Sequence, residues 1–492
     1  MPSFPDQLLS RLSERFAAQM GWHFPRERWR ELATGIETAA RELGIADATA
    51  YARELLAATL SKRQIEVLAG ALTVGETYFF RDPRSFAILG EHVFPDLIRA
   101  RRDCGRRLRI WSAGCCTGEE AYSLAIVLDR LLPDIDDWQI TLLATDINAR
   151  FLERAVEGTF SEWSFRGAPV WLKERYFNTV TGNTVTGNPV AGRRFAILPR
   201  IKSLVTFAYL NLGEDSYPSL TNNTNAMDLI LCRNVLMYFS AERAAQALRN
   251  FHRSLVSNGL FLFSAVEASP QLAQLFVQVP FEGGVVYRKK NEFDVAPQPV
   301  ATVPEMEESN GAPPWSFDRP AAPLPIAEDS PDGYATALAS FEQGRYAEAA
   351  SVLNTDVVTD LDSATLLARI YANLGDLSAA RSWAERAIAV DRTNALSHYL
   401  RALILQEQNQ LPEAQATLQK TLYLQPDFVL AHFALGNLED RQGRRSVAAR
   451  HFNNALDLLG KFADNDVLPH SDGMAAGSLK EAIRSIVPAD TA

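Results

Sequence analysis

The chain has 492 residues, of which 47% are hydrophobic and 22% charged, a composition ordinary for globular protein that excludes wholesale disorder and fibrous repeats. Its 49 Lys and Arg against 59 Asp and Glu give a formal net charge of −10, which argues against a protein that mainly coats nucleic acid. The sequence has neither the roughly 18-residue apolar run of a membrane span nor a signal-peptide pattern at its start. Its four cysteines form no CxxC pair. We therefore expect a cytoplasmic protein of about three domains, without membrane insertion.

Residues 1–75 are predicted to form a helical N-terminal domain. Apolar residues recur at helical spacing in stretches that begin at Leu8, Trp29 and Tyr51. Arginines are dense in the same region, but acidic residues are interleaved with them. Two interpretations stay open, a basic docking face and an ordinary solvated surface.

Residues 76–290 alternate short apolar runs with helical stretches. This alternation predicts an α/β Rossmann-like sheet that binds its ligand at the carboxyl ends of the strands. The expected strands are 108–112, 140–144, 205–210, 227–231 and 259–264. A Thr-, Asn- and Gly-rich stretch, 177–196, interrupts the pattern and is expected to form a small antiparallel β insert.

The C-terminal part begins with a proline-rich acidic stretch, 291–330, which indicates an extended linker. In residues 331–460, Gly375, Asn409 and Gly443 are spaced by 34 residues, and small residues recur in the same phase. The period resembles tetratricopeptide repeats and predicts an α-solenoid whose groove binds a further protein or peptide partner. In the tail, 461–492, four apolar residues have the spacing of a capping helix: Ala476, Leu479, Ile483 and Ile486.

The candidate site lies where the first two predicted strands end. Gly114 and Gly118 permit a tight turn from the first strand into a helix, and Asp146 stands where α/β folds hydrogen-bond a ribose. The three-glycine dinucleotide fingerprint and the Walker lysine are absent. This combination suits a nucleoside without phosphates, such as S-adenosylmethionine. The alternative that Gly114 and Asp146 are plain turn residues stays open.

Three stretches are more specific: GETYFFRD at 75–82, GCCTGEE at 114–120 and CRNVLMYF at 232–239. In this order and spacing they closely resemble the chemotaxis-receptor glutamate methyltransferases, and the resemblance covers about residues 1–290. A methyltransferase joined to C-terminal tetratricopeptide repeats is similar to a subgroup associated with chemosensory pathways that control outputs beyond swimming. The resemblance implies S-adenosyl-L-methionine as cofactor, S-adenosyl-L-homocysteine as product, and glutamates of a coiled-coil chemoreceptor as substrate.

The resemblance also implies roles for individual residues. Arg81 and Tyr238 would position the accepting carboxylate. Thr77 and Arg81 would reach the methionine end of the cofactor, Glu119 would bind it from the first turn of a helix, and Asp146 would bind its ribose. The remaining implied contacts are the pair that lines the adenine and the pair beneath the cofactor: Asn211 and Leu212, and Arg233 and Asn234. Gly75 departs from the Asn of some members, and the basic helix that docks on the receptor would correspond to arginines between Arg26 and Arg41.

The expected chemistry needs no general base, because a glutamate carboxylate is ionised at neutral pH. No Ser-His-Asp or Cys-His set is evident, and the histidines lack metal-ligand spacing, so no metal is predicted. Structural roles stay open for Tyr238 as a core tyrosine and for Arg81 as a salt-bridge residue.

Two functional alternatives also stay open. One is a methyltransferase for nucleic acid or small molecules, which Arg233-Asn234-Val235-Leu236 disfavours because base methylation commonly uses an Asn/Asp-Pro-Pro-Tyr loop there. The acidic balance of the chain also disfavours a nucleic-acid substrate. The other is a degenerate methyltransferase domain that serves as a scaffold for the repeats.

Overall fold

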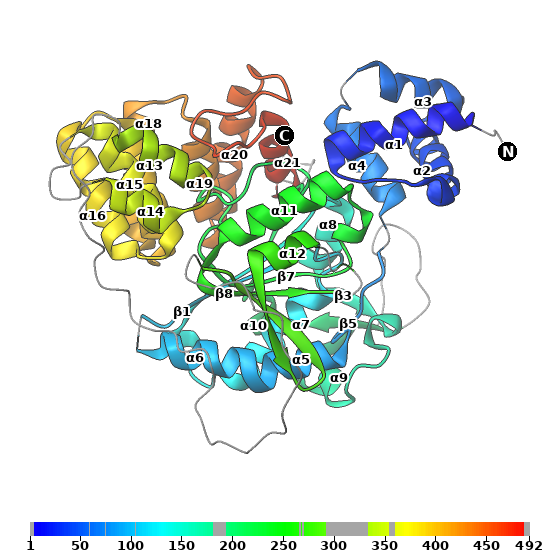
Figure 1. The fold of residues 1–492 in the computed structure, drawn as a ribbon, viewed down its shortest axis with the longest axis horizontal. Helices are drawn as coiled ribbons and strands as arrows, with labels where there is room; N and C mark the ends of the chain where they lie inside the picture. The colour runs from blue at the N-terminus through cyan, green and yellow to red at the C-terminus, as the bar shows by residue number, and fades with distance from the viewer. Residues whose placement is uncertain are drawn as a thin grey trace, which may run out of the picture.

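The computed structural model describes residues 4–58, 60–73, 75–103, 105–180, 193–264, 267, 270–291, 333–353 and 360–486. The described parts form an N-terminal helical unit, a central sheet covered by helices, and a C-terminal array of helix pairs (Figure 1). The predicted fold class is confirmed. The linker beyond Asn291 and residues 181–192 of the predicted insert lie outside the described residues.

The N-terminal unit consists of α1 (Asp6–Met20), α2 (Trp29–Glu42), α3 (Ala48–Ala57) and α4 (Lys62–Leu72), with a 3-10 turn at Arg26–Arg28. Local signals start two of these helices. The Asp47 side chain accepts hydrogen bonds from the first backbone N–H groups of α3, and Ser61 with Gln64 forms a capping box at α4. The core contains the apolar residues that the helical spacing predicts, among them Leu12, Phe16, Leu32, Ile36 and Tyr51.

The central sheet has seven strands in the order β6-β2-β1-β7-β8-β10-β9. They are β1 (Arg107–Ala113), β2 (Gln139–Asp146), β6 (Val205–Tyr209), β7 (Met227–Cys232), β8 (Leu255–Phe263), β9 (Phe276–Phe281) and β10 (Gly284–Lys289). The five predicted strands are present and parallel, while the β9–β10 hairpin is an addition that the sequence analysis did not predict. Pro280 lies in β9 at the sheet edge, where proline is best tolerated within a sheet.

Helices cover the sheet and carry the chain between its strands. They are α5 (Pro83–Ile88), the π-helical turn η2 (Leu89–Val93), α6 (Phe94–Arg102), α7 (Glu119–Leu131), α8 (Ala149–Glu157), α9 (Trp171–Tyr176), α10 (Pro199–Lys202), α11 (Ala241–Ser254) and α12 (Pro270–Leu275). The parallel register pairs Ala113 with Thr145, so the turn after β1 lies beside the end of β2. β1 lies between β2, which follows it in the chain, and β7, which the chain reaches only after β6 at the sheet edge. The strand order therefore reverses at β1, and a ligand crevice opens there at the carboxyl ends of the strands.

A second, three-stranded antiparallel sheet has the order β3-β5-β4. It consists of β3 (Thr159–Ser161), β4 (Phe177–Val180) and β5 (Arg194–Ile197). The strands β4 and β5 begin and end the stretch in which a β insert is expected. Phe79, Phe160, Phe165 and Phe177 pack edge-on or stacked against one another beneath this sheet, and so join it to the segment that precedes α5.

The repeat array consists of four helix pairs. They are α13 (Gly333–Glu342), α14 (Tyr346–Val352), α15 (Leu361–Leu374), α16 (Leu377–Val390), α17 (Ala395–Glu407), α18 (Leu411–Leu424), α19 (Val429–Arg441) and α20 (Arg445–Leu459). Gly375, Asn409 and Gly443 lie in the turns within three of these pairs and have φ of 83°, 58° and 75°. The 34-residue period therefore marks positions that need left-handed backbone, which Gly and Asn adopt most readily.

The array lies directly against the central sheet. Leu220, in the loop between β6 and β7, is buried in the core of the array, and the hydroxyls of Thr221 and Tyr399 lie 3.2 Å apart. Glu407 of α17 forms ion pairs with Arg107 at 2.5 Å and with Arg109 at 3.4 Å. The loop after β6 thus joins the two domains.

The last helix, α21 (Ala476–Ile486), contacts α20, the edge strand β6, α4 and α8. In Figure 1 it lies between the repeat array and the N-terminal helices. Leu479 and Ile483 are fully buried there, so the apolar stripe of the tail packs into the core of the protein. In the described part of the chain, no helix is long and apolar enough to cross a membrane.

Candidate active site

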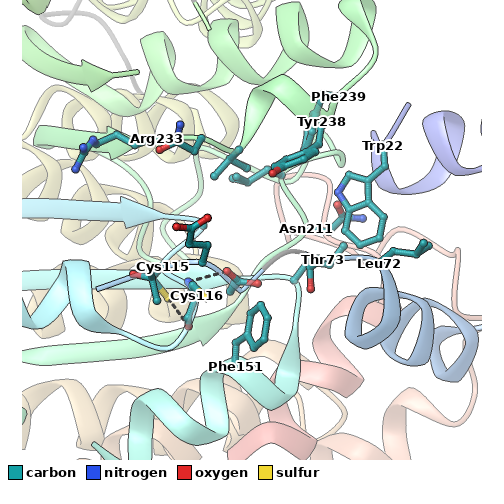
Figure 2. Close-up of a pocket in the computed structure, with 18 of the residues that line it drawn as sticks. Trp22, Leu72, Thr73, Cys115, Cys116, Phe151, Asn211, Arg233, Tyr238 and Phe239 are labelled. Atoms are coloured by element: carbon teal, nitrogen blue, oxygen red, sulfur yellow. Dashed lines mark hydrogen bonds between the residues drawn. The ribbon is translucent and has the colours of Figure 1, made fainter. Parts of the chain in front are cut away.

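A pocket lies between the N-terminal unit and the carboxyl ends of the sheet strands (Figure 2). It brings together nine of the ten site residues that the sequence analysis singled out: Thr77, Arg81, Gly114, Asp146, Asn211, Leu212, Arg233, Asn234 and Tyr238. The three sequence motifs meet in this pocket, although the third follows the second by more than a hundred residues along the chain. Glu119 does not line it, and its neighbour Glu120 does.

The turn after β1 requires glycine at its first position. Gly114 has φ of 78°, and a Cβ at this residue would lie 2.4 Å from Cγ2 of Val235. The backbone N–H groups of Gly114 and Cys115 both donate to the Thr145 carbonyl, at 2.8 and 2.9 Å. These contacts hold the glycine turn against the end of β2 and against the loop that follows β7.

Asp146 lies where β2 ends. Its carboxylate accepts hydrogen bonds from the backbone N–H of Cys116 at 2.9 Å and of Asn148 at 2.8 Å (Figure 2 shows the first). Burial raises the pKa of Asp146 from 3.8 to about 6, although these hydrogen bonds oppose the rise. The carboxylate is therefore held in place by the protein and is ionised above that pH.

The two glutamates at the start of α7 differ in environment. Glu119 is 2% exposed, and its carboxylate accepts hydrogen bonds from Thr117 at 2.6 Å and Ser164 at 2.9 Å. Burial is the largest influence on its pKa and raises it. Glu120 instead lines the pocket and accepts a hydrogen bond from Ser112 at 2.8 Å. The sequence offers no signal to separate the two, because both begin a helix whose next eight residues, 121–128, are buried.

Arg233 joins the three motifs. Its guanidinium is 7% exposed and donates to the Arg81 carbonyl at 3.0 Å, to Glu120 at 3.3 Å and to Asp82 at 3.2 Å. The side chain of Arg81 donates to the Glu76 carbonyl at 2.5 Å. Asn234 has φ of 59°, and its backbone N–H donates a hydrogen bond to the Glu267 carboxylate at 2.8 Å. A charged network thus supports one side of the pocket.

The N-terminal unit closes the other side. The His23 N–H donates to the Tyr238 carbonyl at 2.7 Å, and the Ser240 N–H donates to the Gly21 carbonyl at 2.8 Å. The Arg28 guanidinium lies 4.9 Å from the centroid of the Tyr238 ring, a cation–π distance. The segment after α1 is therefore docked on the loop after β7.

Further residues line the pocket beyond the predicted set. Three of them lie within the motifs, Cys116, Val235 and Phe239, and the others come from elements outside the motifs: Trp22, Phe24, Arg28, Leu72, Thr73 and Phe151. One of them explains Gly75. A Cβ at Gly75 would lie 2.8 Å from the Phe151 ring, so Phe151 occupies the space that a side chain at 75 would need. Figure 2 shows Phe151 on the opposite side of the pocket from Tyr238 and Phe239.

The charges of the lining fit a nucleoside with an amino-acid end. Three arginines, Arg28, Arg81 and Arg233, are matched by Glu76, Glu120 and Asp146. A polyphosphate would need an excess of positive charge, whereas a sulfonium amino acid carries both signs. Apolar walls from Leu210, Leu212 and Phe151 suit a base. The fold and this pocket define the class of Rossmann-like α/β enzymes that bind a nucleoside without phosphates.

Comparison with known proteins identifies the family. Residues 75–284 match the family model described as "CheR methyltransferase, SAM binding domain", and residues 361–394 match that of the tetratricopeptide repeat. The chain is 35% identical over 229 residues to chemotaxis protein methyltransferase 1 of Pseudomonas aeruginosa, which covers 46% of this chain and 77% of that protein. It is 32% identical over 229 residues to chemotaxis protein methyltransferase Cher2 of Pseudomonas putida, again 46% and 77% of the two chains.

A third relative extends over both halves of the chain. The probable biofilm formation methyltransferase WspC of Pseudomonas aeruginosa is 28% identical over 403 residues, which cover 79% of this chain and 86% of that protein. The chain belongs to the CheR methyltransferase family and carries C-terminal tetratricopeptide repeats. The resemblance and the prediction of a methyltransferase enzyme are confirmed.

Proposed function

We propose that this protein transfers a methyl group from S-adenosylmethionine to glutamate side chains of a chemoreceptor-like coiled coil. In this role it serves as the adaptation enzyme of a chemosensory pathway. The observation that carries the proposal is the single pocket in which residues of all three motifs meet. The names of the relatives, chemotaxis methyltransferases and a biofilm methyltransferase, support the pathway.

The pocket residues divide according to the part of the cofactor that each would contact. We assign the ribose hydroxyls to Asp146 and the adenine wall to Asn211 and Leu212. We place the amino-acid end near Thr77 and Arg81. Gly114, Arg233 and Asn234 form the floor, and Glu120 takes the place that the sequence analysis gave to Glu119. The cofactor supplies the reactive methyl group, which it carries on a positively charged sulfur.

The chain's own part in catalysis is alignment and exclusion of water. The accepting carboxylate is already ionised at neutral pH, so no residue has to remove a proton. Arg81 and Tyr238 orient that carboxylate, and Arg28 keeps the Tyr238 ring in place from 4.9 Å. The docked segment around Trp22 helps keep the site dry, which favours a transition state in which opposite charges partly cancel. Alignment of this kind contributes on the order of 7–11 kcal/mol in favourable cases.

Radiolabelled methyl transfer tests the proposal. The purified protein and labelled S-adenosylmethionine are added to bacterial membranes and cytosol, and base-labile methyl ester is counted. We expect label in a receptor-sized protein, and a loss of about 100-fold for Arg81→Ala. The matched control is Arg99→Ala in α6, an exposed arginine whose ion pair with Asp96 lies outside the pocket. Cofactor binding without ester formation on any receptor would favour the scaffold function instead.

The repeats imply a protein partner. We propose that this partner is a component of the same chemosensory pathway, because the relative WspC combines both parts over most of its length.

A further inference from the structure

The turn after β6 is where the three parts of the protein meet. Leu210 and Asn211 line the candidate cofactor pocket on one side. The same two residues, with Glu214, line a second cavity on the other side, between the sheet edge, the repeat helices and α21. The turn is thus a thin wall with the cofactor pocket in front of it and the interdomain cavity behind it.

The side chain of Asn211 shapes this wall. It is 1% exposed, and its amide group donates to the Gln19 carbonyl at 3.2 Å and to the Glu214 carboxylate at 3.1 Å. Its oxygen accepts from the Gly213 N–H at 2.9 Å. An amide nitrogen has two hydrogens, so both are used within the protein. The Asn211 side chain therefore holds the turn, and the turn presents Leu210, Leu212 and its backbone to the pocket.

Glu214 connects the wall to the C-terminal helix. Its second carboxylate oxygen accepts a hydrogen bond from the Ser478 hydroxyl of α21 at 2.9 Å. The burial that raises the pKa of Glu214 is opposed by its hydrogen bonds from Ser478 and Asn211. The turn also packs closely against the N-terminal unit at Gly213, because a Cβ there would lie 2.8 Å from the Met20 backbone. The chain of contacts runs from α21 through Glu214 to Asn211 and on to the N-terminal unit.

We propose that Glu214 is a positioning residue for the cofactor pocket and that α21 holds it through Ser478. The helix α21, which follows the repeats in sequence, then supports the wall of the cofactor pocket. The inference rests on the proposed function, since it concerns the same cofactor. Its consequence is that changes in α21 alter cofactor affinity although α21 contributes no residue to the pocket lining.

Isothermal titration of the full chain with S-adenosylhomocysteine tests this, with thermal midpoints measured in parallel. Glu214→Leu removes the acceptor for the Asn211 amide, and we expect its dissociation constant to rise about tenfold. Ser478→Ala should give a rise of about threefold. Glu214→Gln should stay within about twofold of wild type, because its carbonyl accepts from Asn211 and its amide donates to Ser478.

The control is Thr221→Val, which removes the contact with Tyr399 of the array but leaves the wall intact. We expect unchanged affinity for this variant. Wild-type affinity in both Glu214→Leu and Ser478→Ala would overturn the inference. Equal losses in Thr221→Val and Glu214→Leu would also overturn it, because general loosening of the interface would then explain them. No binding by the wild type would instead refute the proposed function itself.

Discussion

The buried carboxylate of Asp146 makes the stability of the folded protein depend on pH, and this dependence can be measured. Burial raises its pKa from 3.8 to about 6. Between these values the folded protein binds more protons than the unfolded chain, so Asp146 adds stability at low pH that is lost as pH rises through this window. The full difference is about 3 kcal/mol, and about 1.4 kcal/mol of it develops between about pH 8 and about pH 5.

The perturbation is Asp146→Asn, which removes the titrating group but keeps the shape of the side chain. One of the two backbone N–H donors, from Cys116 or Asn148, then loses its acceptor. That cost does not depend on pH. We therefore expect wild type to gain about 1.4 kcal/mol relative to the variant on going from about pH 8 to about pH 5.

Urea unfolding at the two pH values measures this change. Asp427→Asn, the same substitution at an exposed position, is the control. If the difference between wild type and Asp146→Asn stayed constant within about 0.5 kcal/mol, the buried carboxylate would not be titrating as described. Affinity for S-adenosylhomocysteine should fall as pH drops below about 6, because the protonated group accepts ribose hydrogen bonds less well.

Two further substitutions test the turn and the domain contact. Gly114→Ala should destabilise by at least about 2 kcal/mol in urea unfolding, because left-handed backbone and the approach to Val235 both oppose a side chain. Gly105→Ala, at φ of 85° with open space around it, should cost only about 1 kcal/mol, and equal losses would remove the steric argument. Glu407→Gln removes the stronger of the two carboxylate charges that act on buried Arg109, the other being Asp228, so we expect a loss of about 3 kcal/mol in the same assay. A loss below about 1 kcal/mol would show that the interface does not depend on this pair.

Much of the fold could be predicted because its signals are local. The period that links Gly375, Asn409 and Gly443 corresponds to turns with positive φ, and each predicted strand overlaps an observed one. The β9–β10 hairpin was missed because Pro280 lies within the first of its strands, and proline argues against a strand. Strand propensity is weakest where a strand lies at the edge of a sheet.

The predicted site residues lie either in the three motifs or at the ends of parallel strands. Arg233 and Asp146 follow strands and are found that way, whereas Arg28 and Phe151 enter the pocket from other elements through tertiary packing. No local pattern separates Glu119 from Glu120, since only the packing against Ser164 decides which faces inward. The arginines between Arg26 and Arg41 remain a predicted receptor-docking surface.

The position of Leu220 shows that the methyltransferase half does not have a complete surface without the repeats. Residues 75–284 match the family model of the methyltransferase domain on their own, yet in this chain the loop after β6 inserts the apolar side chain of Leu220 into the array. A shortened protein that ends before residue 331 would expose that leucine and leave strand β6 without α21, and unprotected edge strands invite pairing between chains. The methyltransferase half therefore depends on the array and on α21 to cover part of its surface. In this protein, exchange or loss of the repeats would require changes in the surface of the methyltransferase half that they cover.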